Sequence, residues 1–207
     1  MFDKLVRDYH LHPIIDHFTI ALLAFGIGAE LLAAAAAILP RGRTNWRAAA
    51  RQALRSTSLI LVVAGAAAAI LSYLSGDAEA DRLWDTMSPG AQQLLAGADG
   101  PASYLSHAVL GQYLMYAFLF LAAWRVLIEF SARLSRWRIA FLAAAALAVA
   151  GLLYQGKTGG ELVYQYGVGT TSGSRPAPNA AIHGGPAPLD LSHRSRLYKI
   201  AASAARS

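Results

Sequence analysis

The sequence predicts an all-α integral membrane protein, a four-helix bundle followed by an irregular C-terminal tail. Four apolar stretches approach or exceed the roughly 20 residues that a helix needs to cross the hydrocarbon core of a bilayer. The chain is 56% hydrophobic and only 14% charged, a balance far more apolar than that of an ordinary soluble domain. Its charged residues are gathered between the apolar stretches, which is typical of membrane helices joined by links in water.

The expected spans cover residues 17–39, 57–74, 107–128 and 138–155. The first apolar stretch is too long for the core of a signal peptide, and the segment before it mixes acids with bases, so we expect no cleaved signal peptide. Residues 1–169 should form the membrane domain. Residues 170–207 should form an extended tail, rich in proline and glycine, whose last part can form a short helix.

The arginines predict the orientation of the spans. The link between the first two spans contains arginines and no acid, and the link between the last two is also rich in arginine: Arg41, Arg43, Arg47, Arg51 and Arg55, then Arg133, Arg136 and Arg138. By the positive-inside rule both links are cytoplasmic, so both termini should lie outside, in the periplasm of a bacterial inner membrane. The formal charge of +6 then reflects topology, and we expect no nucleic-acid partner.

Two segments should lie over the outer ends of the helices. The connection Gly76–Pro101 is long, with a break at Ser88-Pro89-Gly90, and we expect it to form a lid. The stretch Gly159–Gly169 is rich in glycine and tyrosine, so we expect tight turns that cover the same end.

The first and third spans each begin with a histidine, His17 and His107. Alternating topology puts both on the outer side at similar depth, and ionisable residues in a membrane usually have a function. Small residues follow each histidine on its own helix face: Ala21 and Ala24 after His17, and Gly111 after His107. Two neutral imidazoles can ligate a haem iron axially, so this pattern favours a b-type haem held by His17 and His107.

The residues leave two alternatives open. His12 can fold over the site, and three imidazoles with Asp16 or Asp85 would suit copper or zinc, although His12 can equally be the second haem ligand. The histidines can also be simple hydrogen-bonding groups in a cofactor-free structural subunit. The chain has no cysteine, which excludes thiolate ligands and covalent attachment of a c-type haem.

The remaining polar residues carry less information. Glu30 lies within the first span, and we expect it to be neutral and hydrogen-bonded to a neighbouring helix, for instance through Ser58. His10, His183 and His193 should be exposed to solvent. We find no internal sequence repeat and no motif of a known enzyme class, so a catalytic activity of this chain alone is not expected.

Several of these features resemble the four-helix bacterial membrane family catalogued as domain of unknown function 2231. The resemblance covers His12 to Gly169, and its motifs are the run His12–Leu23, Ser75-Gly76-Asp77, His107 and the run Gly159–Gly169. Thr19 and Glu30 depart from the residues usual at their positions, proline and aspartate. Family members occur fused to Rieske and cytochrome c domains, which implies a respiratory electron-transfer setting.

Together these observations predict a membrane redox subunit that binds haem b near the periplasmic face. The expected cofactor-binding residues are His17, His107, His12, Gly111, Ala21 and Ala24, with His17 and His107 as the metal ligands. The expected partners are the lipid membrane and a periplasmic or membrane redox protein, such as a cytochrome c or a Rieske protein.

Overall fold

A computed structural model of the chain describes residues 11–38, 46–97, 104–131 and 133–169. All of these residues belong to one compact unit, which comprises residues 1–173. His10, the tail from residue 170 and the short helix expected within it lie outside the described residues.

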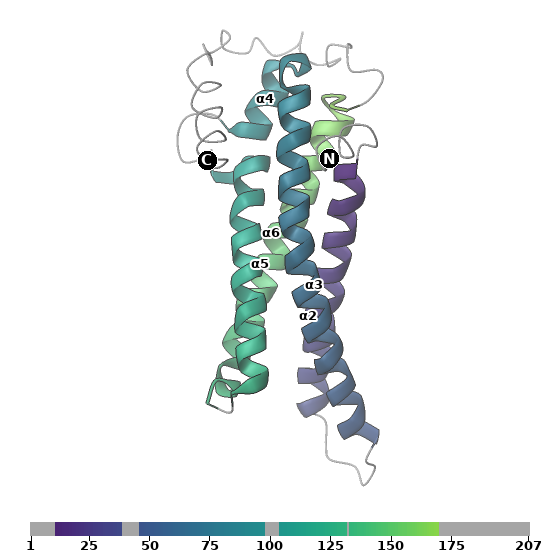
Figure 1. Cartoon of the computed structure of the whole chain (residues 1–207), viewed down its shortest axis with the longest axis vertical. Helices are drawn as coiled ribbons and strands as arrows, with labels where there is room; N and C mark the ends of the chain where they lie inside the picture. The colour runs from purple at the N-terminus through teal and green to yellow at the C-terminus, as the bar shows by residue number, and fades with distance from the viewer. Residues whose placement is uncertain (1–10, 39–45, 98–103, 132, 170–207) are drawn as a thin grey trace. The chain divides into compact units, whose positions relative to one another are not determined.

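Four long helices form the described part of the chain (Figure 1). They are α2 (Leu11–Ile38), α3 (Trp46–Leu83), α5 (His107–Phe130) and α6 (Arg138–Tyr164). Each is long and apolar enough to cross a membrane, which confirms the prediction of an all-helical protein with four spans. Three short elements complete the description: η1 (Trp84–Thr86), α4 (Pro89–Ala96) and η3 (Ser135–Trp137).

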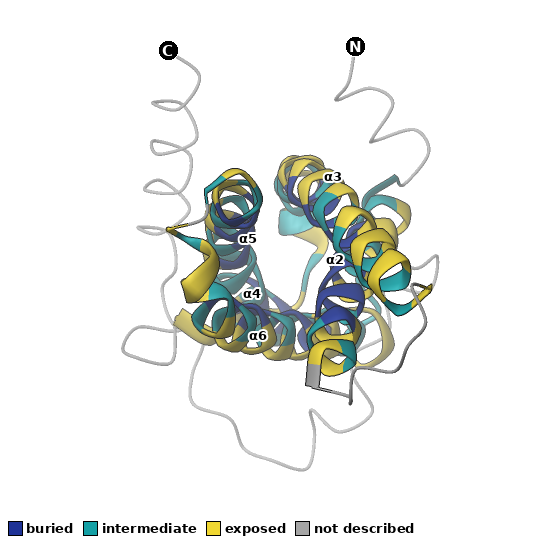
Figure 2. Cartoon of the chain, turned by 90° about the horizontal axis from the view of Figure 1, so that it is seen from below, coloured by how far each residue is buried: buried dark blue, intermediate teal, exposed yellow. Residues whose placement is uncertain are grey.

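The four helices are arranged as a ring (Figure 2). Helix α2 packs along α3, α3 along α5 and α5 along α6, while α6 closes the ring through a lighter contact with α2. Helix α2 therefore lies diagonally opposite α5, and α3 lies opposite α6. Helices α2 and α5 both start at the end of the bundle where α4 lies, so the hairpins α2–α3 and α5–α6 run in the same direction (Figure 1).

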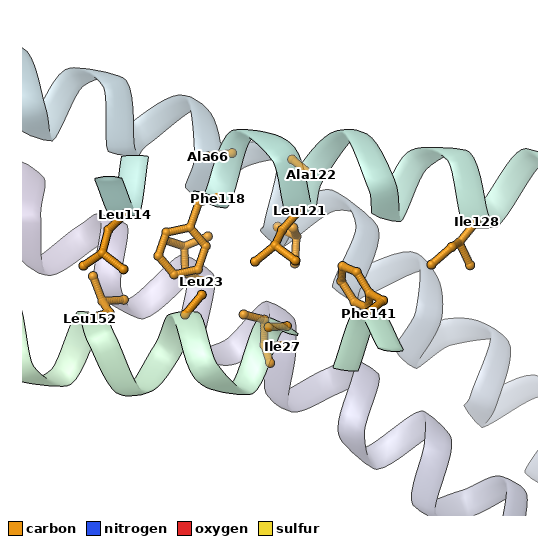
Figure 3. Packing of buried hydrophobic residues seen from close by; sticks show 13 residues of the cluster. Leu23, Ile27, Ala66, Leu114, Phe118, Leu121, Ala122, Ile128, Phe141 and Leu152 are labelled. Carbon is orange, nitrogen blue, oxygen red and sulfur yellow. The ribbon is translucent and has the colours of Figure 1, made fainter. Parts of the chain in front are cut away.

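Apolar side chains from all four helices fill the centre of the bundle (Figure 3). The largest of them are Leu23, Ile27, Val62, Leu114, Phe118, Leu121, Phe141 and Leu152. Equally large apolar residues such as Phe25, Phe120 and Ile139 point outward and are exposed. A bundle that is apolar both inside and outside is expected for helices in lipid.

A glycine allows α2 and α3 to approach closely. A Cβ atom on Gly65 would lie 2.7 Å from the Cγ atom of Leu23, which is itself completely buried. Only glycine leaves room for Leu23 here, as is common where membrane helices pack. This contact helps to explain why α2 and α3 form the tightest pair of the bundle.

Helix α3 is longer than its expected span and includes the start of the expected outer connection. It continues through Ser75 and Gly76 to Leu83, and so includes the first part of the connection that we expect to form a lid. The segment after Gly76 contains no proline, and Arg82 forms an ion pair with Glu79 within it. The apolar run ends at Leu74, but nothing in the sequence ends the helix there, so Ser75 and Gly76 hold fixed positions on α3.

The predicted break at Ser88-Pro89-Gly90 is the start of a helix. Ser88 is the N-cap of α4, because its Oγ atom accepts a hydrogen bond of 3.3 Å from the backbone N–H of Ala91. Pro89 follows at the first helical position, where its missing N–H and fixed φ cost nothing.

The glycine-rich stretch after the fourth span is also helical for longer than expected. Gly159 and Gly160 lie inside α6, which ends at Tyr164. Turns begin only after that residue, where Gly167 and Gly169 have φ values of 67° and 74° that favour glycine. The prediction of tight turns from Gly159 onward is therefore wrong for the first six residues of the stretch.

Candidate histidine site

His12 lies in the first turn of α2 and is fixed by a hydroxyl group of α3. Its Nδ1 atom is 3.0 Å from Ser75 Oγ. The Ser75 Oγ atom also lies 2.9 Å from the carbonyl oxygen of Ser72. When the hydroxyl donates its only proton to this carbonyl, it accepts from the imidazole, so that His12 carries its proton on Nδ1 and leaves the Nε2 lone pair for another group.

The start of α2 differs from the prediction. The sequence predicts a first span that starts at residue 17, with His12 before it and able to fold over the site, whereas α2 begins at Leu11 and contains both His12 and Pro13. A proline in the first turn of a helix breaks no hydrogen bond, because the N–H groups there have no partner in the helix. His12 is consequently part of the bundle.

His107 begins α5 and is fixed in the same way by α6. Its Nδ1 atom is 3.1 Å from the Oγ1 atom of Thr158, which is buried. The Thr158 hydroxyl donates to the carbonyl oxygen of Gln155 at 2.9 Å, so it accepts a proton from His107 Nδ1. The lone pair of His107 Nε2 is again left available.

Each imidazole also rests against a glycine of the neighbouring helix. A Cβ atom on Gly76 would lie 2.8 Å from His12 Cε1, and a Cβ atom on Gly159 would lie 3.0 Å from His107 Cε1. A side chain at either position would push the ring away. The pairs Ser75-Gly76 and Thr158-Gly159 thus perform the same task, a hydroxyl that holds the ring and a glycine that makes room for it.

These matching contacts reveal an internal repeat, in contrast to our reading of the sequence. Glu30 follows His12 by 18 residues on α2, and Arg125 follows His107 by 18 residues on α5. Glu30 and Arg125 thus stand at equivalent positions of the two hairpins, and they form an ion pair across the bundle.

The second helix of each hairpin shows the same correspondence. Ser75 follows Arg55 by 20 residues on α3, and Thr158 follows Arg138 by 20 residues on α6. Few residue identities are shared, which explains why the repeat is hard to see in the sequence. The hairpins α2–α3 and α5–α6 are therefore related by an approximate two-fold axis along the bundle, with His12 and His107 at equivalent places.

The two histidines lie at one end of the bundle, which we call the histidine end. His12 and Asp16 both lie close enough to His107 to act on it electrostatically. Asp16 accepts a hydrogen bond of 2.9 Å from Ser72, and its equivalent on α5 is Gly111. Gly111 has no carboxylate, and the side chain of Gln155 fills the space next to it. The Nε2 atom of Gln155 would lie 2.7 Å from a Cβ atom on Gly111.

Gln155 brings an unusual atom to the site. Its Oε1 atom is buried and has no hydrogen-bond partner among the described residues. A buried acceptor without a partner is costly, so a donor from a water molecule or a ligand would be favourable here.

His17 does not join this arrangement. It is exposed on α2, and its Nδ1–H donates to the carbonyl oxygen of Pro13 at 2.6 Å. With Phe18 and Ala21 it lines a shallow apolar groove, and Ala24 is also exposed. Five residues after His12, His17 lies on a different helix face, and it is His12 that lies close enough to His107 to act on it electrostatically.

The four-ligand copper or zinc set is not assembled in the described part of the chain. No group of three His, Asp or Glu side chains there could hold a metal ion together. His17 faces away from the other two histidines, and Asp85 is exposed in η1. Three imidazoles with Asp16 or Asp85 are therefore not brought together.

A small apolar cluster covers the histidine end. Helix α4 contributes Ala91 and Leu95, which pack with Leu162 of α6. Ala108, the residue after His107, lies against this cluster, as does Tyr166. The described part of the connection thus packs over α5 and α6, and it keeps water from the side of the site formed by the second hairpin.

The opposite end of the bundle contains a buried charge network that the sequence analysis missed. Arg125 Nε donates to Glu30 Oε2 at 3.1 Å, and Arg138 Nη1 donates to Glu30 Oε1 at 3.0 Å. Arg125 also donates to Glu129 at 2.9 Å and to the carbonyl oxygen of Arg55 at 2.9 Å. We call this the arginine end.

Glu30 is therefore bonded to Arg125 and Arg138, and the expected hydrogen bond to Ser58 is absent, since Ser58 Oγ has no partner among the described residues. Arg125 is completely buried. It was not predicted as a partner of Glu30, because it lies within the third apolar stretch and not among the charges between the stretches. The sequence could have predicted this ion pair, because an acid buried in the first span is usually paired with a base at similar depth in another span.

Comparison with known families gives one result. The model of a family described as "Predicted membrane protein (DUF2231)" matches residues 9–172, which include the four long helices and both histidines. No match was found among curated proteins or among solved structures.

Proposed function

Because the chain belongs to the DUF2231 family of predicted membrane proteins, whose description names no activity, we propose its function from the histidine site. We propose that the protein is a membrane redox subunit that binds b-type haem. His12 and His107 would hold the iron through their Nε2 atoms. When bound, a haem of this kind carries one electron at a time between donor and acceptor proteins.

The observation that carries this proposal is the matching treatment of the two imidazoles. Ser75 and Thr158 each accept the Nδ1 proton of one histidine and so leave its Nε2 lone pair unused. A histidine that serves only for packing needs no such tautomer, whereas metal-ligating histidines commonly donate their other N–H to a fixed oxygen. Two equivalent histidines, one from each hairpin, are also the number that a haem with two axial imidazoles requires.

Small residues line the histidine end. Gly76 and Gly159 make room for the imidazole rings of His12 and His107, and Gly111 makes room for the side chain of Gln155. The apolar cover from α4 and the end of α6 lowers water access to the second histidine, which stabilises the bound state of an apolar ring.

In electron transfer, the protein residues would hold the haem in place and shield it from water. Ser75 and Thr158 fix the ring orientation, and a hydrogen-bonded imidazole is a more basic ligand, which stabilises the oxidised iron. Asp16 adds negative charge close to both histidines and acts in the same direction.

The charge pattern supports a periplasmic location of the histidine end. Both links at the arginine end are rich in arginine, so the positive-inside rule assigns this end to the cytoplasm of a bacterial inner membrane. The haem would then exchange electrons with a redox protein at the periplasmic face, for which a cytochrome c or a Rieske protein is suited.

A copper or zinc site is the second candidate function. Asp16 lies close enough to His12 and His107 to act on both, and two imidazoles with a carboxylate suit these metals. The described residues offer no complete three-ligand group, so haem is the better supported ligand.

The test is a dithionite-reduced minus oxidised absorption spectrum of the purified protein, with a pyridine haemochrome assay and metal analysis on the same sample. We expect sharp b-type bands and a stoichiometric haem content. A colourless, folded protein expressed with ample haem would overturn the proposal. Bound copper or zinc would then support the second candidate, and neither metal nor haem would indicate a structural subunit.

A further inference from the structure

Among the described residues, the buried network at the arginine end contains one more guanidinium group than it has carboxylates. Arg125 and Arg138 share Glu30, and Arg125 also bonds to Glu129. Arg55 lies in the same network, because its carbonyl oxygen accepts from Arg125 and its charge acts on Arg138. Three guanidinium groups therefore meet two carboxylates, and both carboxylates are already bonded.

The unbalanced charge coincides with two unused hydrogen-bonding atoms. In the part of the chain that the structure describes, Arg55 Nε and Ser58 Oγ are buried and have no hydrogen-bond partner. Ser58 is completely buried and follows Arg55 by three residues, so both side chains lie on the same side of α3. Buried polar groups are nearly always hydrogen-bonded, and two adjacent exceptions beside an excess positive charge point to a missing acceptor.

The position of the network fits the depth of lipid headgroups. Arg138 is the first residue of α6, and Arg55 is its equivalent on α3. Trp137, which directly precedes Arg138, is half exposed. Exposed tryptophans mark the boundary between the hydrocarbon core and the headgroup layer.

We propose that the arginine end binds a phosphate-type oxyanion, supplied by the headgroup of an anionic phospholipid or by free phosphate. Arg55 donates to the oxyanion through its guanidinium, and Ser58 donates its hydroxyl proton. Arg138 contributes charge while its Nη1 atom stays on Glu30. The oxyanion balances the third guanidinium and supplies acceptors for both unused donors.

The two sources can be distinguished with the full-length protein in a neutral detergent. Native mass spectrometry would measure the binding of phosphatidylglycerol against phosphatidylcholine. The shift of the thermal unfolding midpoint would be measured in sodium phosphate against sodium chloride of equal ionic strength. Selective binding of phosphatidylglycerol alone identifies a lipid headgroup, and a stabilisation by inorganic phosphate identifies a site open to the free anion.

Three variants make the assignment specific. Arg55→Gln should weaken binding of the effective ligand about tenfold, since one charge-assisted hydrogen bond and one charge are lost. Ser58→Ala should weaken it less, without any change of charge and with little risk to folding. Arg51→Gln, one turn away on α3, removes the same charge outside the network and should bind as the unchanged protein does.

The proposal is overturned when neither probe binds selectively, or when Arg51→Gln loses as much affinity as Arg55→Gln does. Equal losses in Arg51→Gln and Arg55→Gln would show that the ligand responds to the total positive charge of this end and does not bind at Arg55. The haem spectrum plays no part in this test, so its outcome is independent of the function proposed above.

Discussion

Arg125 and Glu30 occupy equivalent positions in the two hairpins and bond to each other across the bundle, with Arg125 Nε 3.1 Å from Glu30 Oε2. Equivalent positions thus carry opposite charges in the two halves of the chain. Both side chains are almost completely buried. A charge buried in this way is tolerated only because its partner is present.

We predict that Arg125→Gln destabilises the protein by about 3 kcal/mol, because Glu30 and Glu129 lose a buried cationic partner. Glu30→Gln should also be destabilising, but the double variant should be clearly more stable than the sum of the single losses predicts. Unfolding in mixed detergent and sodium dodecyl sulfate micelles measures these free energies. Additive losses within about 0.5 kcal/mol would contradict a direct interaction.

The glycines beside the imidazoles allow a second prediction. Gly76→Ala and Gly159→Ala each place a methyl group against a histidine ring, 2.8 Å and 3.0 Å from its Cε1 atom. Each variant should retain clearly less haem, as judged by the pyridine haemochrome assay on purified protein. Gly156→Ala is the matched control, since nothing lies within 4 Å of its added Cβ atom. Equal haem contents in all three variants would refute a role of these glycines at the site.

The hydroxyl groups behind the histidines lead to a third prediction. Thr158→Val keeps the shape of the side chain but removes the acceptor of the His107 Nδ1 proton. Haem affinity should fall about 10- to 100-fold, as is usual when the group that orients a metal-ligating histidine is lost. Thr158→Ser retains the hydroxyl and should behave nearly as the unchanged protein. A loss of affinity in Thr158→Ser together with full retention in Thr158→Val would mean that packing of the methyl group matters, and not the hydrogen bond.

The packing of α2 on α3 gives a fourth prediction, which concerns stability alone. Gly65→Ala forces a methyl group to within 2.7 Å of Leu23 and should cost about 1–3 kcal/mol. The added variant Leu23→Ala should relieve part of this cost by making space. If Gly65→Ala unfolds at the temperature of the unchanged protein, the close approach of these helices is not as described.

The number and type of helices could be predicted from hydropathy, but their ends could not. The apolar runs predict the segments within the lipid, and α3 and α6 continue beyond them over residues 75–83 and 156–164, which contain no proline. These extensions are important for the site, because they carry Gly76, Thr158 and Gly159.

The candidate site could be predicted only in part. His107 and His12 were both recognised, but His17 was preferred as the partner of His107 because it stands directly before the apolar run. The helix extends further, and its periodicity turns His17 outward. The correspondence of Ser75-Gly76 with Thr158-Gly159 could have revealed the repeat, although two short matches become convincing only when the contacts to His12 and His107 are known.

The most direct test of the central claim compares two variants of neighbouring histidines, His12→Ala and His17→Ala, by their reduced minus oxidised absorption spectra. We predict that His12→Ala loses the b-type bands, because it removes one axial ligand. His17→Ala should keep the spectrum and the haem content of the unchanged protein, since His17 is exposed on another face of α2. Loss of the bands in His17→Ala with full retention in His12→Ala would contradict the account.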